Sequence, residues 1–153
     1  MQLLRSVFRL TGLGVLVLCN SLVAQQPTTA QRVLGVFPSV ADGVGDTIVV
    51  PERVRVGEEF LVNVTTVGGG CDEAGDHGVV LSEGSASVYV YDFTAANRPN
   101  TVCPMILKTF QHRVPMRFDQ PGQAVIRIWG RRLGRYEPEG GSPAVLEVRV
   151  EVY

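Results

Sequence analysis

Residues 114–128 read VPMRFDQPGQAVIRI, and this stretch decides the fold class. Apolar residues alternate with other residues on both sides of the Pro121-Gly122 pair, which is a turn-forming dipeptide. Alternation by twos places the apolar side chains on one face of an extended strand. The stretch therefore predicts two β-strands joined at a corner, whose inward-facing residues are Val114, Met116, Phe118, Ala124, Ile126 and Ile128.

The same alternation recurs along the chain, in residues 60–65, 86–91 and 146–152, and turn residues separate the runs. With shorter runs at 33–37, 47–50, 79–82 and 105–110, we expect eight or nine short strands. Strand follows strand with no crossover helix, which indicates an antiparallel, all-β, two-sheet sandwich. Pro115 lies within a run, so its strand is expected at a sheet edge or at a bulge. Whether residues 33–37 form a strand of the sandwich stays open at this point.

The N-terminal segment is typical of an export signal. Residues 1–24 have Arg5 and Arg9 as their only charges, then a short apolar run, and a polar stretch follows from Gln25. The apolar run is shorter than the roughly 20 residues that span a membrane. We therefore expect residues 1–24 to be a signal peptide, 25–31 a polar linker and 32–153 a single domain, with no membrane span after cleavage. A lipid anchor at Cys19 and an uncleaved anchor are the alternatives.

The two remaining cysteines, Cys71 and Cys103, are predicted to form a disulfide, because an even pair in an exported protein first indicates one. Lys108 is the only lysine, and a strong bias toward arginine is usual in high-GC bacterial genomes. Together these features predict a bacterial, periplasmic or extracellular protein.

Residues 54–64, VRVGEEFLVNV, resemble the second strand of bacterial immunoglobulin-like (fibronectin-III-like) domains. Residues 114–128 resemble the strand, Pro-Gly corner and next strand that precede the last strand of such domains, and 146–152 would be that last strand. The resemblance covers about residues 46–153 and implies an immunoglobulin-like β-sandwich of about seven to nine strands. It implies a fold and no particular function. The whole chain also resembles small exported bacterial proteins of uncharacterised type.

Composition restricts the functional classes. The net charge of −1 and the pI of about 6.1 give no electrostatic reason to expect nucleic-acid binding. No nucleophile elbow, phosphate loop or dinucleotide-binding glycine pattern is present, so we expect neither a catalytic site nor a cofactor.

Residues 71–77, CDEAGDH, form the densest polar cluster. We interpret it as an acidic, glycine-flanked loop held by the disulfide. The alternative is a metal site formed by Cys71, Asp76 and His77, which are ligand types that zinc accepts. A second alternative is a small hydrolase, if a histidine and a carboxylate converge in a pocket.

The most distinctive surface candidate combines arginine and aromatic side chains, which dominate binding hot spots. Alternation places Arg127, Trp129 and Arg131 on one strand face, and the neighbouring basic and aromatic residues extend the candidate set to Arg127, Trp129, Arg131, Arg132, Arg135 and Tyr136. A purely structural role, in which Trp129 packs at the sheet margin under arginine stems, is the competing interpretation. The sequence thus predicts an exported, non-catalytic module that binds a protein or glycan, or that supports the cell envelope.

Overall fold

The computed structural model describes residues 30–39, 46–95, 100, 102–132 and 141–153. These residues form nine β-strands and no helix: β1 (Gln31–Leu34), β2 (Ile48–Val49), β3 (Arg53–Val54), β4 (Phe60–Gly68), β5 (Asp72–Ser82), β6 (Ser85–Thr94), β7 (Lys108–Met116), β8 (Gly122–Arg132) and β9 (Ser142–Val152). The expected all-β class and strand number are confirmed for this part of the chain. Within it, no helix is long and apolar enough to cross a membrane.

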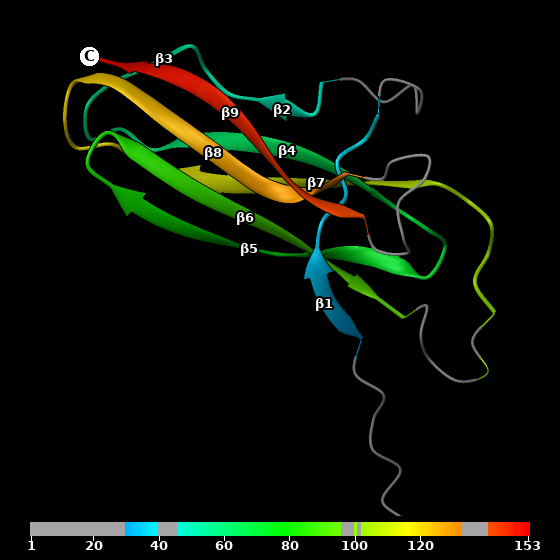
Figure 1. The fold of residues 1–153 in the computed structure, drawn as a ribbon. Coiled ribbons are helices and arrows are strands. Elements are labelled where there is room, and N and C mark those ends of the chain that lie inside the picture. The colour runs from blue at the N-terminus through cyan, green and yellow to red at the C-terminus, as the bar shows by residue number, and fades with distance from the viewer. Residues whose placement is uncertain (1–29, 40–45, 96–99, 101, 133–140) are drawn as a thin grey trace, which may run out of the picture.

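The strands form two sheets that lie one over the other (Figure 1). The larger sheet has the order β1-β6-β8-β9-β3, with β5 on the other side of β6, and the smaller sheet has the order β2-β4-β7. Both sheets contribute inward side chains to one apolar core, as the alternation predicts. Its fully buried members include Val62, Val64, Val88, Val90, Val114, Ile126 and Ile128. Burying each such side chain contributes roughly 1.5–3 kcal/mol.

The expectation of purely antiparallel pairing is wrong. β6 pairs with β8 in parallel, and β3 pairs with β9 in parallel, while the other pairs are antiparallel. The physical reason is that β7, which lies between β6 and β8 in sequence, belongs to the smaller sheet. The chain crosses to that sheet and returns, so β8 runs in the same direction as β6, and a strand replaces the usual helical crossover.

The interpretation of residues 71–77 as a loop is also wrong. Asp72–Ser82 is one long edge strand, which pairs with β6 and has a register shift between Ala74 and His77. Its charged and glycine residues have a low strand preference, but the backbone ladder to β6 holds them extended. The turn between β5 and β6 has only two residues, and its Gly84 has a φ of +67°, which glycine adopts without strain.

Two further expectations concern single segments. Pro115 lies in β7, which pairs only with β4 among the described strands, so its position at a sheet edge is confirmed. The segment 33–37 does join the fold: β1 pairs with β6, and Val36 then bridges both Val67 of β4 and Arg131 of β8. The N-terminal segment therefore links the two sheets at one end of the molecule.

The predicted disulfide joins Cys71 to Cys103, with Cα atoms 5.2 Å apart. It connects the β4–β5 turn to the connection between β6 and β7. Such a bond typically contributes about 2–4 kcal/mol to folding stability.

Candidate functional site

The outer face of the larger sheet contains a pair of aromatic side chains. Tyr89 of β6 and Trp129 of β8 are direct neighbours in the parallel ladder. Their ring centroids are 5.9 Å apart, and the ring planes are tilted by only 13°. Both side chains are half-buried and face away from the core, because the adjacent Val88, Val90 and Ile128 are fully buried.

The indole N–H of Trp129 lacks a hydrogen-bond partner in the part of the chain that the structure describes. Its Nε1–H is buried and has no hydrogen-bond acceptor among the described residues. A buried donor without an acceptor costs about 1–3 kcal/mol. This N–H therefore offsets part of the stability gained by burying the indole ring.

Small and exposed apolar residues flank the aromatic pair. Gly78 of β5 is opposite Tyr89, and Val145 of β9 is opposite Trp129. Val80, two residues after Gly78 on the same face of β5, is 58% exposed. Val145 on β9 is 42% exposed. A strip of apolar surface thus crosses four strands, with Tyr89 and Trp129 at its centre.

The structure brings together part of the predicted arginine set. Arg127 is exposed and pairs with Glu147 on β9, with Nε 3.3 Å from the carboxylate. The Nε of Arg131 donates to the carbonyl oxygen of Leu34 at 2.6 Å, and burial lowers the pKa of this guanidinium, partly opposed by Asp92 and Asp72. Arg131 therefore has a structural contact with β1. Arg132 lies exposed at the end of β8, and Arg135 and Tyr136 lie outside the described residues.

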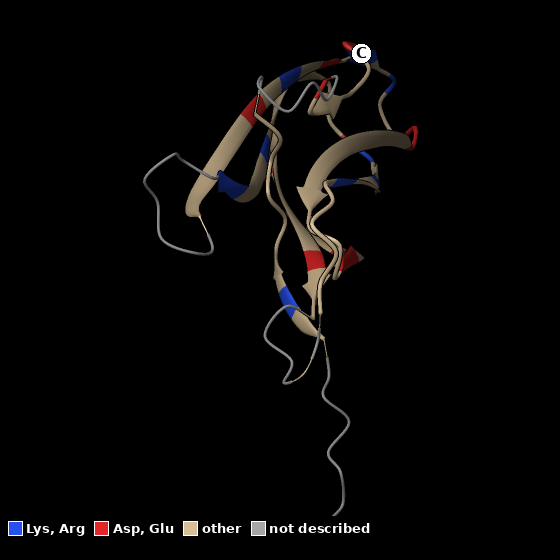
Figure 2. Ribbon diagram, turned by 90° about the vertical axis from the view of Figure 1, so that its right-hand side faces the viewer, with Lys and Arg blue, Asp and Glu red and all other residues tan. Residues whose placement is uncertain are grey.

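A cation–aromatic contact lies on the same outer face. The guanidinium of Arg32 in β1 lies 3.3 Å from the ring centroid of Tyr91. Its Nε also donates to Asp76 at 2.8 Å, and this hydrogen bond raises the pKa of Arg32. Basic and acidic residues are interspersed along the strands (Figure 2), so the surface offers charges of both signs to a partner.

The alternative metal site does not assemble in the described residues. Cys71 is in the disulfide, Asp76 pairs with Arg32, and His77 is exposed on β5. The described part of the chain contains no group of three His, Cys, Asp or Glu side chains that could hold a metal ion.

A buried polar cluster, formed by Thr66, Asp92 and His112, lies between the two sheets. Thr66 of β4 is 0% exposed, and Asp92 of β6 and His112 of β7 are 5% and 4% exposed. The Oγ1 of Thr66 lies 2.9 Å from Nε2 of His112. The Oδ1 of Asp92 lies 3.1 Å from the same nitrogen, although it has no well-aligned hydrogen-bond donor among the described residues.

This cluster has the residue types of a catalytic triad but not its geometry. In a triad, the carboxylate and the nucleophile contact different ring nitrogens of the histidine. Here both approach Nε2, so the carboxylate cannot orient the ring for proton transfer from the hydroxyl. The three side chains are also sealed from solvent. The arrangement fits a structural polar link between the sheets.

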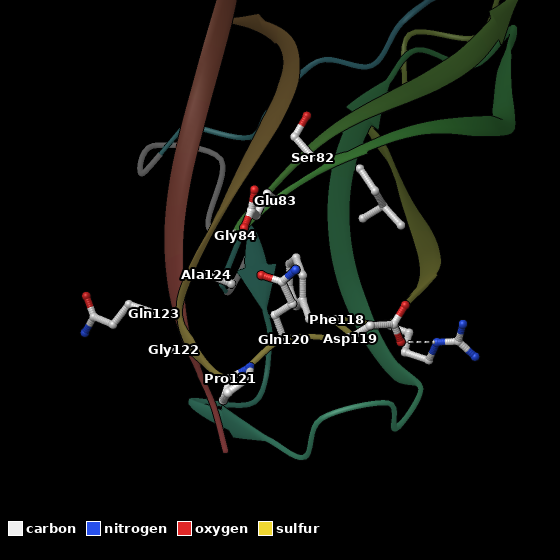
Figure 3. Close-up of a pocket in the computed structure, with 12 residues that line it drawn as sticks. Ser82, Glu83, Gly84, Phe118, Asp119, Gln120, Pro121, Gly122, Gln123 and Ala124 are labelled. Carbon is white, nitrogen blue, oxygen red and sulfur yellow. Dashed lines mark ion pairs between the residues drawn. The ribbon is translucent and has the colours of Figure 1, made fainter.

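Surface grooves lie elsewhere. A groove of about 260 Å³ lies between the β5–β6 turn and the β7–β8 corner (Figure 3). Its lining includes Glu83 and Asp119, the latter paired with Arg117 at 3.0 Å, but no histidine. The condition for a hydrolase, a pocket with both a histidine and a carboxylate, is not met in this groove.

Tyr89 and the polar cluster were not singled out from the sequence, although the alternation of inward and outward residues indicates both. Thr66, Asp92 and His112 continue the inward alternation of their strands, after Val64, after Val90 and before Val114. A polar residue at a core-facing position on three strands indicates a buried polar contact. Tyr89 lies between the inward-facing Val88 and Val90, and so it belongs to the outer face.

No protein-family model, curated protein or solved structure matches the chain.

Proposed function

We propose that the chain is an exported, non-catalytic binding module, and that the outer face around Tyr89 and Trp129 recognises a protein of the cell envelope or exterior. In this proposal the fold is an immunoglobulin-like sandwich. The pairing of β4 with β7 and of β8 with β9 supports it, because the two sheets of such domains contain corresponding pairs. The parallel β6–β8 pair departs from that pattern, since those sheets are antiparallel.

The stacked Tyr89–Trp129 pair on an outward sheet face is the observation on which the proposal rests. Tyrosine, tryptophan and arginine are enriched at the centres of protein interfaces. The apolar strip through Val80 and Val145 supplies area, and the Arg127–Glu147 pair beside it supplies polar contacts at the rim. This combination favours a protein over a glycan partner.

Capture experiments with the exported chain test the proposal. The bait is wild type, Trp129→Ala, Tyr89→Ala or Arg127→Ala, exposed to an envelope extract of the producing cells. Arg113→Ala, an exposed strand arginine of β7 in the smaller sheet, is the matched control. Isothermal titration calorimetry then gives the dissociation constant of the captured partner for every variant. Trp129, the only tryptophan, adds a fluorescence readout in the variants that retain it.

We expect the dissociation constant to rise about thirtyfold in Trp129→Ala, as for a hot-spot residue, and to stay unchanged in Arg113→Ala. Equal affinity of the wild type and of both aromatic variants would refute the proposal. Loss of binding to a glycan array in the same variants, with no captured protein, would reassign the surface to glycans.

A further inference from the structure

The connection between β6 and β7 exposes an unusual number of large apolar side chains. Val102 is 93% exposed, Met105 is 103% exposed, and Ile106 and Leu107 are 56% and 59% exposed. These four side chains lie within six consecutive residues, here called the apolar loop (Val102–Leu107). Contiguous apolar surface of this kind marks a site of interaction with a protein or a membrane.

Contacts with residues 70–72, at the β4–β5 turn and the start of β5, hold the apolar loop in place. Cys103 is bonded to Cys71, and Pro104 packs so closely on Gly70 that a Cβ added at Gly70 would overlap it. The ammonium group of Lys108 donates to the carbonyl oxygens of Gly70 and Asp72. A loop fixed in this way cannot easily fold its side chains back onto the core, so their exposure is part of the native structure.

The loop lies at the end of the molecule from which the N-terminal segment departs. Gln31, the first residue of β1, pairs with Thr94, the last residue of β6, and the connection to β7 begins immediately after Thr94. Figure 1 shows the start of β1 and this connection at the end of the molecule away from the C-terminus. If the chain kept a lipid anchor at Cys19, the alternative to signal cleavage, this end of the domain would be the one that faces the membrane.

The polar groups of the loop favour a lipid over a protein partner. Residues 102–107 contain no charged side chain, and the neighbouring Lys108 ammonium is already bound to backbone oxygens. Pro104 has no N–H, and the N–H of Ile106 donates to the Pro104 carbonyl at 2.9 Å. Pro104 and Ile106 therefore leave no free backbone N–H, and the loop brings no charge into the headgroup region, where its other N–H groups can still reach water. A protein interface would instead be expected to have a polar rim.

We propose that the apolar loop inserts into the headgroup and upper acyl-chain region of a lipid bilayer, and so holds the domain on a membrane surface with its N-terminal end toward the lipid. The depth is that of other interfacial apolar elements, about 5–10 Å. The sheet face around Trp129 is not part of this contact, and the inference does not rest on the proposed binding function.

Two methionines provide the reporter. Met105 is fully exposed in the apolar loop, whereas Met116 is 3% exposed in the core. The processed, exported chain is treated with hydrogen peroxide, with and without vesicles, and sulfoxide formation at each methionine is followed by peptide mass spectrometry. The vesicles contain phosphatidylcholine alone, or phosphatidylethanolamine with phosphatidylglycerol. This readout works whether or not the N-terminus itself is anchored.

The variant Ile106→Ser/Leu107→Ser removes apolar surface but keeps the Met105 reporter. Val49→Ser/Leu61→Ser is the matched control, because these side chains are 52% and 43% exposed on β2 and β4 of the smaller sheet, outside both proposed surfaces. We expect both vesicle types to slow Met105 oxidation in the wild type and in the control. In the loop variant, the vesicle concentration that gives half-maximal protection of Met105 should rise about tenfold or more.

Equal oxidation of Met105 with and without vesicles would overturn the proposal and leave a protein as the partner. Protection that requires anionic lipid, disappears in salt and persists in the loop variant would overturn it too, because it would show charge-driven binding elsewhere. Oxidation of Met116 would reveal an unfolded variant, and the single substitution Ile106→Ser then replaces the double one.

Discussion

The outer face around Trp129 and the buried cluster around His112 both include a residue of β6 but have opposite environments. On β6, Tyr89 points outward to the stack with Trp129, whereas Asp92, three residues later, points inward to His112. The aromatic pair lies at the surface, where a partner can reach it. The Thr66–Asp92–His112 cluster has the residue types of a catalytic site, yet its burial makes it a structural element. Whether a residue faces outward or inward on its strand therefore decides which of the two groups a partner can reach.

The largest expected effect comes from breaking the buried pair. His112→Phe keeps the volume of the ring but removes the imidazole from the buried Asp92 carboxylate, which keeps only its longer-range interaction with Arg131. We expect a loss of about 3–5 kcal/mol in the free energy of unfolding, because removing one member of a buried pair is strongly destabilising. Urea denaturation of wild type and variant, followed by far-UV circular dichroism, measures it.

The double variant Asp92→Leu/His112→Phe is the decisive control. Replacing both members of a buried pair by apolar groups is often nearly neutral, so the double variant should be more stable than His112→Phe alone. If the double variant is as unstable as the single one, the unpaired carboxylate is not the cause of the loss.

Gly35→Ala, next to the buried cluster, should cause the next largest loss in the free energy of unfolding. A Cβ at this position would lie 2.6 Å from Cγ2 of Thr66 and 3.0 Å from Oδ2 of Asp92. Overpacking of this kind should cost about 1–3 kcal/mol in thermal or chemical unfolding. On the outer face, Gly78→Ala is the counterpart, since its nearest neighbour, Cβ of Tyr89, would be 4.0 Å away. Equal destabilisation by the two substitutions would contradict the packing described here.

Trp129→Ala should have a smaller effect on stability than on binding. The ring is half-buried and stacks on one neighbour, and such a stack contributes about 0.5–1.5 kcal/mol beyond its burial. We expect a total loss of about 1–2 kcal/mol in urea denaturation and an intact circular dichroism spectrum. A cooperative collapse of the fold would instead assign Trp129 a core role.

Arg127→Ala should be the mildest substitution. Its ion pair with Glu147 is exposed, with side-chain exposures of 45% and 43%. Exposed pairs contribute little, so the unfolding free energy should change by less than about 0.5 kcal/mol. A measured loss above 1 kcal/mol would show that the pair is more strongly coupled than its exposure indicates, and would place Arg127 with the structural groups.

Part of this molecule could be predicted because it depends on local pattern. The inward faces of 60–64, 86–90, 114–118 and 124–128 are buried as expected, since alternation by twos is a property of each strand alone. The run 79–82 was expected, but the first part of β5 could not be predicted, because Asp72, Glu73 and Asp76 favour loops unless a neighbouring ladder holds them. Tyr89 could not be chosen over other outward residues until the register placed it beside Trp129.

The sequence by itself determined the all-β class, the inward and outward faces of the strands and the single pair of cysteines available in residues 25–153. Only the tertiary structure decided the strand order, the parallel β6–β8 pair, the meeting of Thr66, Asp92 and His112, and the placement of the apolar loop beside the start of β1. The physical reason is the separation along the chain over which each interaction acts. Alternation acts between residues two apart, whereas pairing depends on packing between segments that are distant in the chain, which no local pattern encodes.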